Sequence, residues 1–311
     1  MIIKSIDCGE ISFLATKMKK IDPGAYTALV TPFTRGGDVD FDAFVRLAER
    51  QLAAGIVGLA LFGCTGEEAT MPLDDRLRAL RDLRRRLPPQ TVLITAGGAS
   101  DTQVAVSLSS ALAGEGADAI LSVVPPYNRP MARGVFEHFT RIADACPAPI
   151  VVSNVPGRTG TALDLDTTLA LASHRNIIAV DEGSGDLGFT MRLVRAAPEG
   201  FLVFSGEDEL TLPMMVIGAH GTFSLVSNQT PDRVAALVAH AKAGRFAAAL
   251  AIHNEILDLS AFNYCETNPA PVKAALAMMG LVEDHLRLPM TPLSDANRTI
   301  MRDHLVRLDL L

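Results

Sequence analysis

One stretch of the chain carries the pattern that decides the fold, and it reads Ile177-Ile178-Ala179-Val180-Asp181-Glu182-Gly183-Ser184-Gly185-Asp186. Its first four residues are apolar and mostly β-branched, which is typical of a buried strand. The strand then ends in charged residues, and a glycine-rich turn follows it. A buried strand that closes on a polar corner is the repeating unit of folds in which parallel strands alternate with helices.

The same unit recurs along the chain, and helical spacing separates its copies. One such helix is expected from Phe41, with Arg46, Glu49 and Arg50 on its polar face. The candidate strands are Ala25–Val30, Val57–Phe62, Val92–Ala96, Ala119–Val124, Ile150–Ser153, Ile177–Val180, Phe201–Phe204 and Gly221–Leu225. Eight alternations predict an α/β fold of the (β/α)8 TIM-barrel type. A doubly wound open sheet, which also alternates strands and helices, is the alternative.

The pattern changes after residue 230, where helices follow one another with no strand between them. The expected helices are Val234–Ala243, Phe246–Leu259, Pro271–Met279 and one from Asp295 to about Leu308. We therefore expect a barrel over residues 21–230 and additional C-terminal helices over residues 231–311 that pack against it.

Residues 1–20 carry no clear pattern and are expected to form an N-terminal extension. Because Met18-Lys19-Lys20 resembles a second start, an upstream extension or a misassigned start is the preferred interpretation. The alternative is a short arm that docks on the barrel or on a neighbouring subunit.

The composition excludes several classes of protein. The net charge of -7, with both signs mixed, argues against a nucleic-acid partner. No apolar run approaches the ~20 residues of a membrane helix, and no secretory signal opens the chain, so we expect a cytoplasmic protein. The cysteines, which form no CxxC pair and predict neither zinc nor disulfides, are Cys8, Cys64, Cys146 and Cys265. We expect neither a metal nor a cofactor.

Catalytic residues of a barrel lie at the C-terminal ends of its strands. The residues at these ends are Thr31, Gly63–Glu67, Pro125–Asn128, Ser153-Asn154, Asp181-Glu182, Ser205–Asp208 and Ser224–Asn228. We therefore expect a candidate site at this end of the barrel.

The corner Gly63-Cys64-Thr65-Gly66-Glu67 is the strongest local signal. A hydroxyl flanked by glycines before a helix can offer free backbone N–H groups and a helix dipole to an anion, and Thr65 would add a hydrogen bond. A small carboxylate suits such a corner. The alternative is an ordinary tight turn between strand and helix.

A second signal is Asn154-Val155-Pro156-Gly157-Arg158-Thr159-Gly160, which places a guanidinium in a loop stiffened by proline. Arginine binds a carboxylate through two parallel hydrogen bonds. Arg158 is therefore a candidate carboxylate ligand, unless it pairs with a structural acid.

Together these motifs resemble the dihydrodipicolinate synthase / N-acetylneuraminate lyase family of pyruvate-dependent class I aldolases. The resemblance covers nearly all of residues 24–280. The motifs that carry it are Ala28–Phe33, Gly63–Glu67, Pro126–Pro130, Asn154–Gly160, Ser205–Asp208 and Asn268–Lys273. It implies a barrel with C-terminal helices and a homotetramer built from tight dimers.

The resemblance also implies roles for individual residues. Thr65 matches the threonine that holds the pyruvate carboxylate, and Arg158 matches the arginine that receives the second substrate. Tyr127 matches a tyrosine that reaches into the neighbouring subunit's site as part of a proton relay. The remaining substrate-binding residues that we expect are Gly66, Gly206 and Phe223.

Three positions depart from the family pattern. Asp181 stands where the family has the lysine that forms a Schiff base with pyruvate, Ser153 replaces its catalytic tyrosine, and Cys64 replaces a relay threonine. A Schiff base needs an amine nucleophile, and a carboxylate cannot form an imine. The chain is therefore expected to be a divergent member of the family that lacks Schiff-base chemistry.

We expect an enzyme that binds a small carboxylate or 2-oxo acid, with Asp181 as general base and with Ser153, Tyr127 and Cys64 as further catalytic residues. One alternative is a non-catalytic carboxylate-binding protein or sensor, in which Asp181 is a neutral substitution in an inactive site. A residual dihydrodipicolinate synthase is less favoured. A metal site at Asp181, Glu182 and Glu207 is also disfavoured, because adjacent strand residues face opposite sides.

Overall fold

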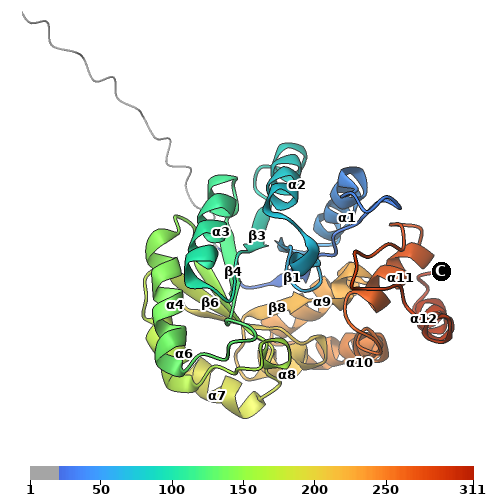
Figure 1. Cartoon of the computed structure of the whole chain (residues 1–311). Coiled ribbons are helices and arrows are strands. Elements are labelled where there is room, and N and C mark those ends of the chain that lie inside the picture. The colour runs from blue at the N-terminus through green and yellow to red at the C-terminus, as the bar shows by residue number, and fades with distance from the viewer. Residues whose placement is uncertain (1–20) are drawn as a thin grey trace, which may run out of the picture.

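A computed structural model describes residues 21–311 and shows a closed barrel of eight parallel strands (Figure 1). Each strand pairs with the next along the chain, and β8 closes the barrel on β1. The strands are β1 (Ala25–Ala28), β2 (Gly58–Leu61), β3 (Val92–Ala96), β4 (Ala119–Val123), β5 (Ile150–Asn154), β6 (Ile177–Glu182), β7 (Leu202–Ser205) and β8 (Gly221–Ser224). The predicted TIM barrel is confirmed. The expected extension over residues 1–20 lies outside the described residues.

Helices surround the strands on the outside of the barrel (Figure 1). The outer helices are α1 (Phe41–Ala53), α2 (Leu73–Arg86), α3 (Thr102–Gly114), α4 (Ala132–Ala145), α6 (Leu165–Ala172), α7 (Leu187–Ala196), α8 (Thr211–Val216) and α9 (Pro231–Lys242). Short helical turns at the strand ends are η1 (Glu68–Thr70), α5 (Pro156–Thr159), η2 (Asp208–Leu210) and η3 (Val226–Asn228). Helix α9 corresponds to the expected helix Val234–Ala243, which the sequence analysis places among the additional C-terminal helices. It packs against β1 and β8 in the position of an eighth barrel helix, so the barrel extends beyond the expected boundary at residue 230.

The predicted additional C-terminal helices are present. They are α10 (Phe246–Phe262), α11 (Ala270–Met278) and α12 (Asp295–Arg307). They follow one another without an intervening strand and gather at one side of the barrel (Figure 1). Helix α10 packs on α9, and α12 packs on both α10 and α11, so these helices extend the outer layer. In the part of the chain that the structure describes, no helix is both long and apolar enough to cross a membrane.

Aspartates fix where several outer helices begin. Asp40, Asp101, Asp164 and Asp186 each accept a hydrogen bond from the backbone N–H three residues later, at 2.7–2.9 Å. Such N-caps satisfy backbone donors that the first helical turn leaves free. Asp186 closes the turn that follows β6, so the stretch that decides the fold contains its own helix start.

Aromatic side chains fill the barrel interior below its C-terminal mouth. The ring of Tyr26 lies 5.6 Å from that of Phe204 and 5.3 Å from that of Phe223. A Cβ at Gly58 would lie 2.7 Å from the Tyr26 ring, so glycine in β2 leaves the space that this ring occupies. This cluster closes the barrel from below, and Phe223 forms part of the floor of the pocket described next.

Candidate active site

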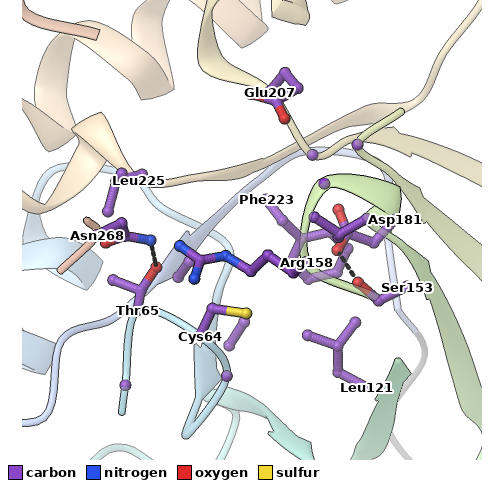
Figure 2. A pocket seen from close by; sticks show the side chains of 18 of the residues that line it. Cys64, Thr65, Leu121, Ser153, Arg158, Asp181, Glu207, Phe223, Leu225 and Asn268 are labelled. Carbon is purple, nitrogen blue, oxygen red and sulfur yellow. Dashed lines mark hydrogen bonds between the residues drawn. The ribbon is translucent and has the colours of Figure 1, made fainter. Parts of the chain in front are cut away.

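A pocket of about 600 Å³ opens at the C-terminal ends of the strands, where barrel sites are expected (Figure 2). Ala28, Ala60, Ser153, Asp181 and Phe223 line it from β1, β2, β5, β6 and β8. The segment between α10 and α11 closes another side. The pocket is therefore built by the barrel and by the C-terminal helices together.

The pocket brings together all but one of the predicted site residues. Those that line it are Cys64, Thr65, Gly66, Ser153, Arg158, Asp181, Gly206 and Phe223. Tyr127 lies outside the pocket, 95% exposed, with a left-handed backbone φ of 73°. Its expected role belongs to the site of a neighbouring subunit, so that role and the expected oligomer stay predictions.

Asp181 lies at the end of β6, next to Ser153 in the β5–β6 register. The Ser153 hydroxyl donates to Asp181 Oδ2 at 2.8 Å, while Asp181 Oδ1 has no hydrogen-bond partner among residues 21–311 (Figure 2). The residue is only 6% exposed. A Cβ at Gly206 would lie 2.6 Å from Oδ1, so glycine at this position leaves room for the carboxylate. A buried carboxylate oxygen without a partner marks a group that waits for a ligand or a proton.

Burial raises the pKa of Asp181 to about 7, and the nearby Glu182 adds to the rise, while the hydrogen bond from Ser153 opposes it. Burial also raises the pKa of Glu207, which follows β7 and lines the pocket, to about 7. Asp208 and Asp181 add to this rise, and Arg158 opposes it. Two acids that titrate near neutral pH therefore share one pocket, which is the property that acid–base catalysis needs.

Glu182 has a structural role. Its carboxylate accepts from Asn154 Nδ2 at 2.7 Å and from the Ser184 N–H at 2.9 Å. It does not line the pocket. The alternation of strand residues thus separates Asp181 from its neighbour, and no group of three or more metal-binding side chains occurs within residues 21–311.

Opposite Asp181, the pocket offers hydrogen-bond donors. Asn268 Nδ2 donates to Thr65 Oγ1 at 3.0 Å, which leaves the Thr65 hydroxyl proton free to point at a ligand (Figure 2). The backbone N–H groups of Thr65 and Gly66 donate no hydrogen bond to a backbone carbonyl within residues 21–311. A Cβ at Gly66 would lie 2.7 Å from the backbone of Phe62, so the corner requires glycine.

The prediction that a helix follows this corner directly and adds its dipole is wrong. Only the three-residue turn η1 follows the corner, and α2 begins later, at Leu73. Because a macrodipole needs several aligned turns, an anion at this corner would be bound by the hydroxyl and the N–H groups. Glu67 and Glu68 close the corner by donating their N–H groups to Cys64 and Gly63.

Arg158 lies on α5 and extends its guanidinium toward the side of the pocket where Thr65 and Asn268 lie (Figure 2). Within residues 21–311 it forms no ion pair with a structural acid. Cys64 lies close by, and burial together with Glu68 raises the pKa of its thiol to about 11. The thiol is therefore protonated at neutral pH and is a weak nucleophile.

The predicted site residues leave out several polar residues of the pocket. Glu207 stands among the strand-end residues Ser205–Asp208 but was given a role only as a disfavoured metal ligand, and Tyr264 and Asn268 were not predicted as site residues. Both of the latter come from the segment before α11, which ends no strand. The signal for Asn268 was its place in one of the motifs that carry the resemblance; for Tyr264 there was none.

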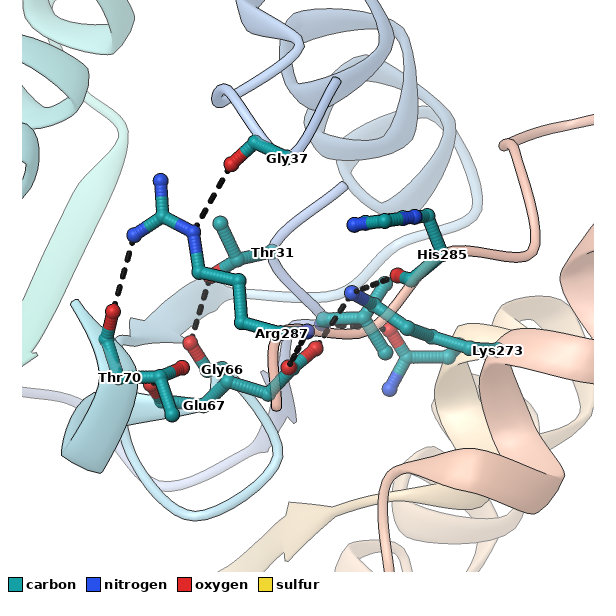
Figure 3. Close-up of polar contacts among 10 residues, drawn as sticks. Thr31, Gly37, Gly66, Glu67, Thr70, Lys273, His285 and Arg287 are labelled. Atoms are coloured by element: carbon teal, nitrogen blue, oxygen red, sulfur yellow. Dashed lines mark hydrogen bonds and ion pairs between the residues drawn. The ribbon is translucent and has the colours of Figure 1, made fainter. Parts of the chain in front are cut away.

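The buried Lys273 does not supply an amine to the pocket. Lys273 Nζ donates to Glu67 Oε1 at 2.5 Å and to the His285 carbonyl at 2.9 Å, and it lies 4.1 Å from the Phe33 ring centroid (Figure 3). Lys242 is exposed and donates to the Pro23 carbonyl. Within residues 21–311, no amine lines the pocket.

The model of the Dihydrodipicolinate synthetase family matches residues 23–307. A 4-hydroxy-tetrahydrodipicolinate synthase from Chlorobium limicola is 40% identical over 289 residues, which are 93% of this chain and 98% of that protein. The dihydrodipicolinate synthase structure from Thermotoga maritima superposes with a TM-score of 0.92 at 32% identity and covers 94% of this chain and all of that one. The chloride-inhibited synthase from Acinetobacter baumannii, solved with pyruvate, gives 0.91 at 34% identity, with coverages of 94% and 100%.

Proposed function

Because the chain belongs to the dihydrodipicolinate synthetase family, we propose that it is a lyase that binds a small carboxylate or 2-oxo acid at the barrel mouth and acts on it without a Schiff base. The observation that carries this proposal is Asp181, a buried carboxylate with one free oxygen and a pKa near 7. The sequence resemblance assigns the Schiff-base lysine of the family to this position. Asp181 is the general base of the proposed reaction.

In the proposed reaction, Thr65 and Arg158 hold the ligand carboxylate. Asp181 takes a proton from the carbon next to the ligand carbonyl, and the electron pair of that C–H bond forms an enolate. The protonated form of Glu207 donates a hydrogen bond to the enolate oxygen, and Ser153 keeps Asp181 oriented. The enolate can then form or release a carbon–carbon bond, as in a lyase reaction.

The names of the relatives favour a second candidate, 4-hydroxy-tetrahydrodipicolinate synthase activity. The identity of 40% over nearly the whole length supports it, but Asp181 in place of an amine opposes it, since imine formation requires the amine. The expected alternative of a non-catalytic binder or sensor has no support among these relatives, all of which carry enzyme names.

Two measurements on the wild-type protein separate these candidates. Incubation with pyruvate and borohydride, followed by intact mass, should leave the mass unchanged; a reduced adduct would revive the synthase. Exchange of the methyl protons of pyruvate in deuterated water, followed by proton NMR, reports enolate formation directly. We expect exchange in the wild type and none in Asp181→Asn. Exchange that persists in Asp181→Asn would remove Asp181 from the role of base.

A further inference from the structure

The pocket has two ends of opposite character (Figure 2). Hydrogen-bond donors gather at one end, where Thr65 and Asn268 lie and toward which Arg158 extends. The other end carries Asp181 and, beyond Gly206, Glu207. A Cβ at Gly183 would lie 3.8 Å from Glu207 Oε1, so the two acids border the same glycine-lined wall.

The charges that line the pocket are predominantly negative. Its acids are Asp181, Glu207 and Glu266, and its one arginine among the lining residues is Arg158. The Glu266 carboxylate already accepts from Ser294 and Asn297. The two remaining acids form no ion pair within residues 21–311. Asp181 Oδ1, in a residue 6% exposed, has no hydrogen-bond partner there.

A plain 2-oxo acid satisfies only the donor end of this pocket. Its carbonyl oxygen is another acceptor, so it offers no hydrogen to an ionised Asp181. A cationic nitrogen on the same carbon offers both a proton donor and a positive charge, which a desolvated carboxylate requires. The resemblance implies a lysine, and thus a cation of the protein, at position 181. With Asp181 at this position, the complementary positive charge has to be carried by the ligand.

We propose that the ligand of this pocket is a carboxylate whose adjacent carbon bears a cationic nitrogen, as in a 2-amino or 2-imino acid. The nitrogen binds Asp181 Oδ1 and Glu207, and the carboxylate binds Thr65 and Arg158. This inference rests on the proposed function, since it uses the same pocket and the same base.

A 2-imino acid makes the proposed chemistry easier, because the ligand itself carries the electron sink that a lysine imine supplies in class I aldolases. Asp181 takes a proton from the carbon next to the C=N group. The C–H electron pair becomes a C=C bond, and the C=N pair moves to nitrogen. The iminium group of the ligand becomes a neutral enamine, and Asp181 becomes protonated. The step needs no oxidant or reductant.

The test is a set of four ligands of small and similar size, titrated calorimetrically against the wild-type protein. L-Proline carries an ammonium, Δ1-pyrroline-2-carboxylate carries an iminium, cyclopentanecarboxylate has no nitrogen, and pyruvate carries a carbonyl. We expect one or both nitrogen ligands to bind about ten- to hundredfold more tightly than the other two. Tighter binding of proline would show that the pocket prefers an ammonium, and tighter binding of Δ1-pyrroline-2-carboxylate would show that it prefers an iminium.

Two variants test which end of the pocket recognises the nitrogen and which end recognises the carboxylate. Asp181→Asn should remove the preference for nitrogen, while Arg158→Met should weaken all ligands by similar factors. Pyruvate or cyclopentanecarboxylate binding as tightly as the nitrogen ligands overturns this inference. The proposed function survives that result if pyruvate still exchanges its methyl protons in an Asp181-dependent way. If no carboxylate binds and no exchange occurs, both proposals fail.

Discussion

Two buried carboxylates at the mouth of the barrel differ in how they are paired. Glu67, 5% exposed, accepts from Lys273 Nζ on one oxygen and from the Arg287 N–H at 3.1 Å on the other (Figure 3). Asp181, 6% exposed, accepts a hydrogen bond only from Ser153 among the residues that the structure describes. Burial is therefore the same for the two acids, and the number of unsatisfied carboxylate oxygens is what distinguishes them; on this ground we expect Glu67 to be structural and Asp181 to be functional.

The largest expected effect on stability comes from the ion pair between Lys273 and Glu67. Lys273→Met leaves Glu67 without its cation and should lower the free energy of unfolding by about 3–5 kcal/mol. Urea denaturation at pH 7 measures it. The matched control is the double variant Glu67→Gln with Lys273→Met, which should recover part of the loss. A loss below about 1 kcal/mol in the single variant would contradict the structural role of this pair.

The second prediction concerns pH. The pKa of Asp181 is raised from 3.8 to about 7 in the folded chain, so the native state holds a proton that the unfolded chain releases. This contribution to stability is full below about pH 4 and is lost as pH rises through about 7. Between pH 5 and 8, wild type should lose roughly 2–3 kcal/mol more than Asp181→Asn.

Denaturant titrations of both proteins at the two pH values check this difference. Because Asp181 itself helps to raise the pKa of Glu207, both proteins are also compared in a Glu207→Gln background, in which Glu207 does not titrate. Parallel pH profiles for wild type and Asp181→Asn would mean that Asp181 is ionised in the folded chain throughout this range.

A third prediction tests the space beside Asp181. Gly206→Ala places a Cβ 2.6 Å from Oδ1 and should destabilise the fold by about 1–2 kcal/mol. Combined with Asp181→Ala, the same substitution should cost clearly less, since the crowded atom is gone. Thermal unfolding of the two single variants and the double variant gives the coupling. Additive losses would place the strain elsewhere, for example against the backbone of Gly183.

The smallest expected effect is at the donor end. Asn268→Ala removes the hydrogen bond that orients the Thr65 hydroxyl, and should weaken binding of the tightest carboxylate about fivefold, or ~1 kcal/mol. Calorimetry measures it, with Thr65→Val as the comparison because that variant removes the donor itself. If Asn268→Ala weakens binding more than Thr65→Val, Asn268 contacts the ligand directly.

The sequence predicted the barrel closely, and each strand lies within two residues of its expected bounds. Apolar runs report strands because both faces of a parallel strand are buried. The strand ends also predicted most of the pocket. The strand ends could not predict the pocket residues that lie outside the strands. Asn268 and Tyr264 reach the pocket from the loop between α10 and α11. Nor could the strand ends reveal that Lys273 is fully engaged by Glu67.

The contact between Lys273 and Glu67 joins residues 206 positions apart. During synthesis, therefore, all eight strands emerge from the ribosome before the cation that neutralises Glu67 exists. We therefore expect the corner that carries Thr65 to reach its final conformation only after α11 has been synthesised. A chain truncated after β8 would thus contain all the barrel strands but would lack the lysine that pairs with Glu67 in this corner.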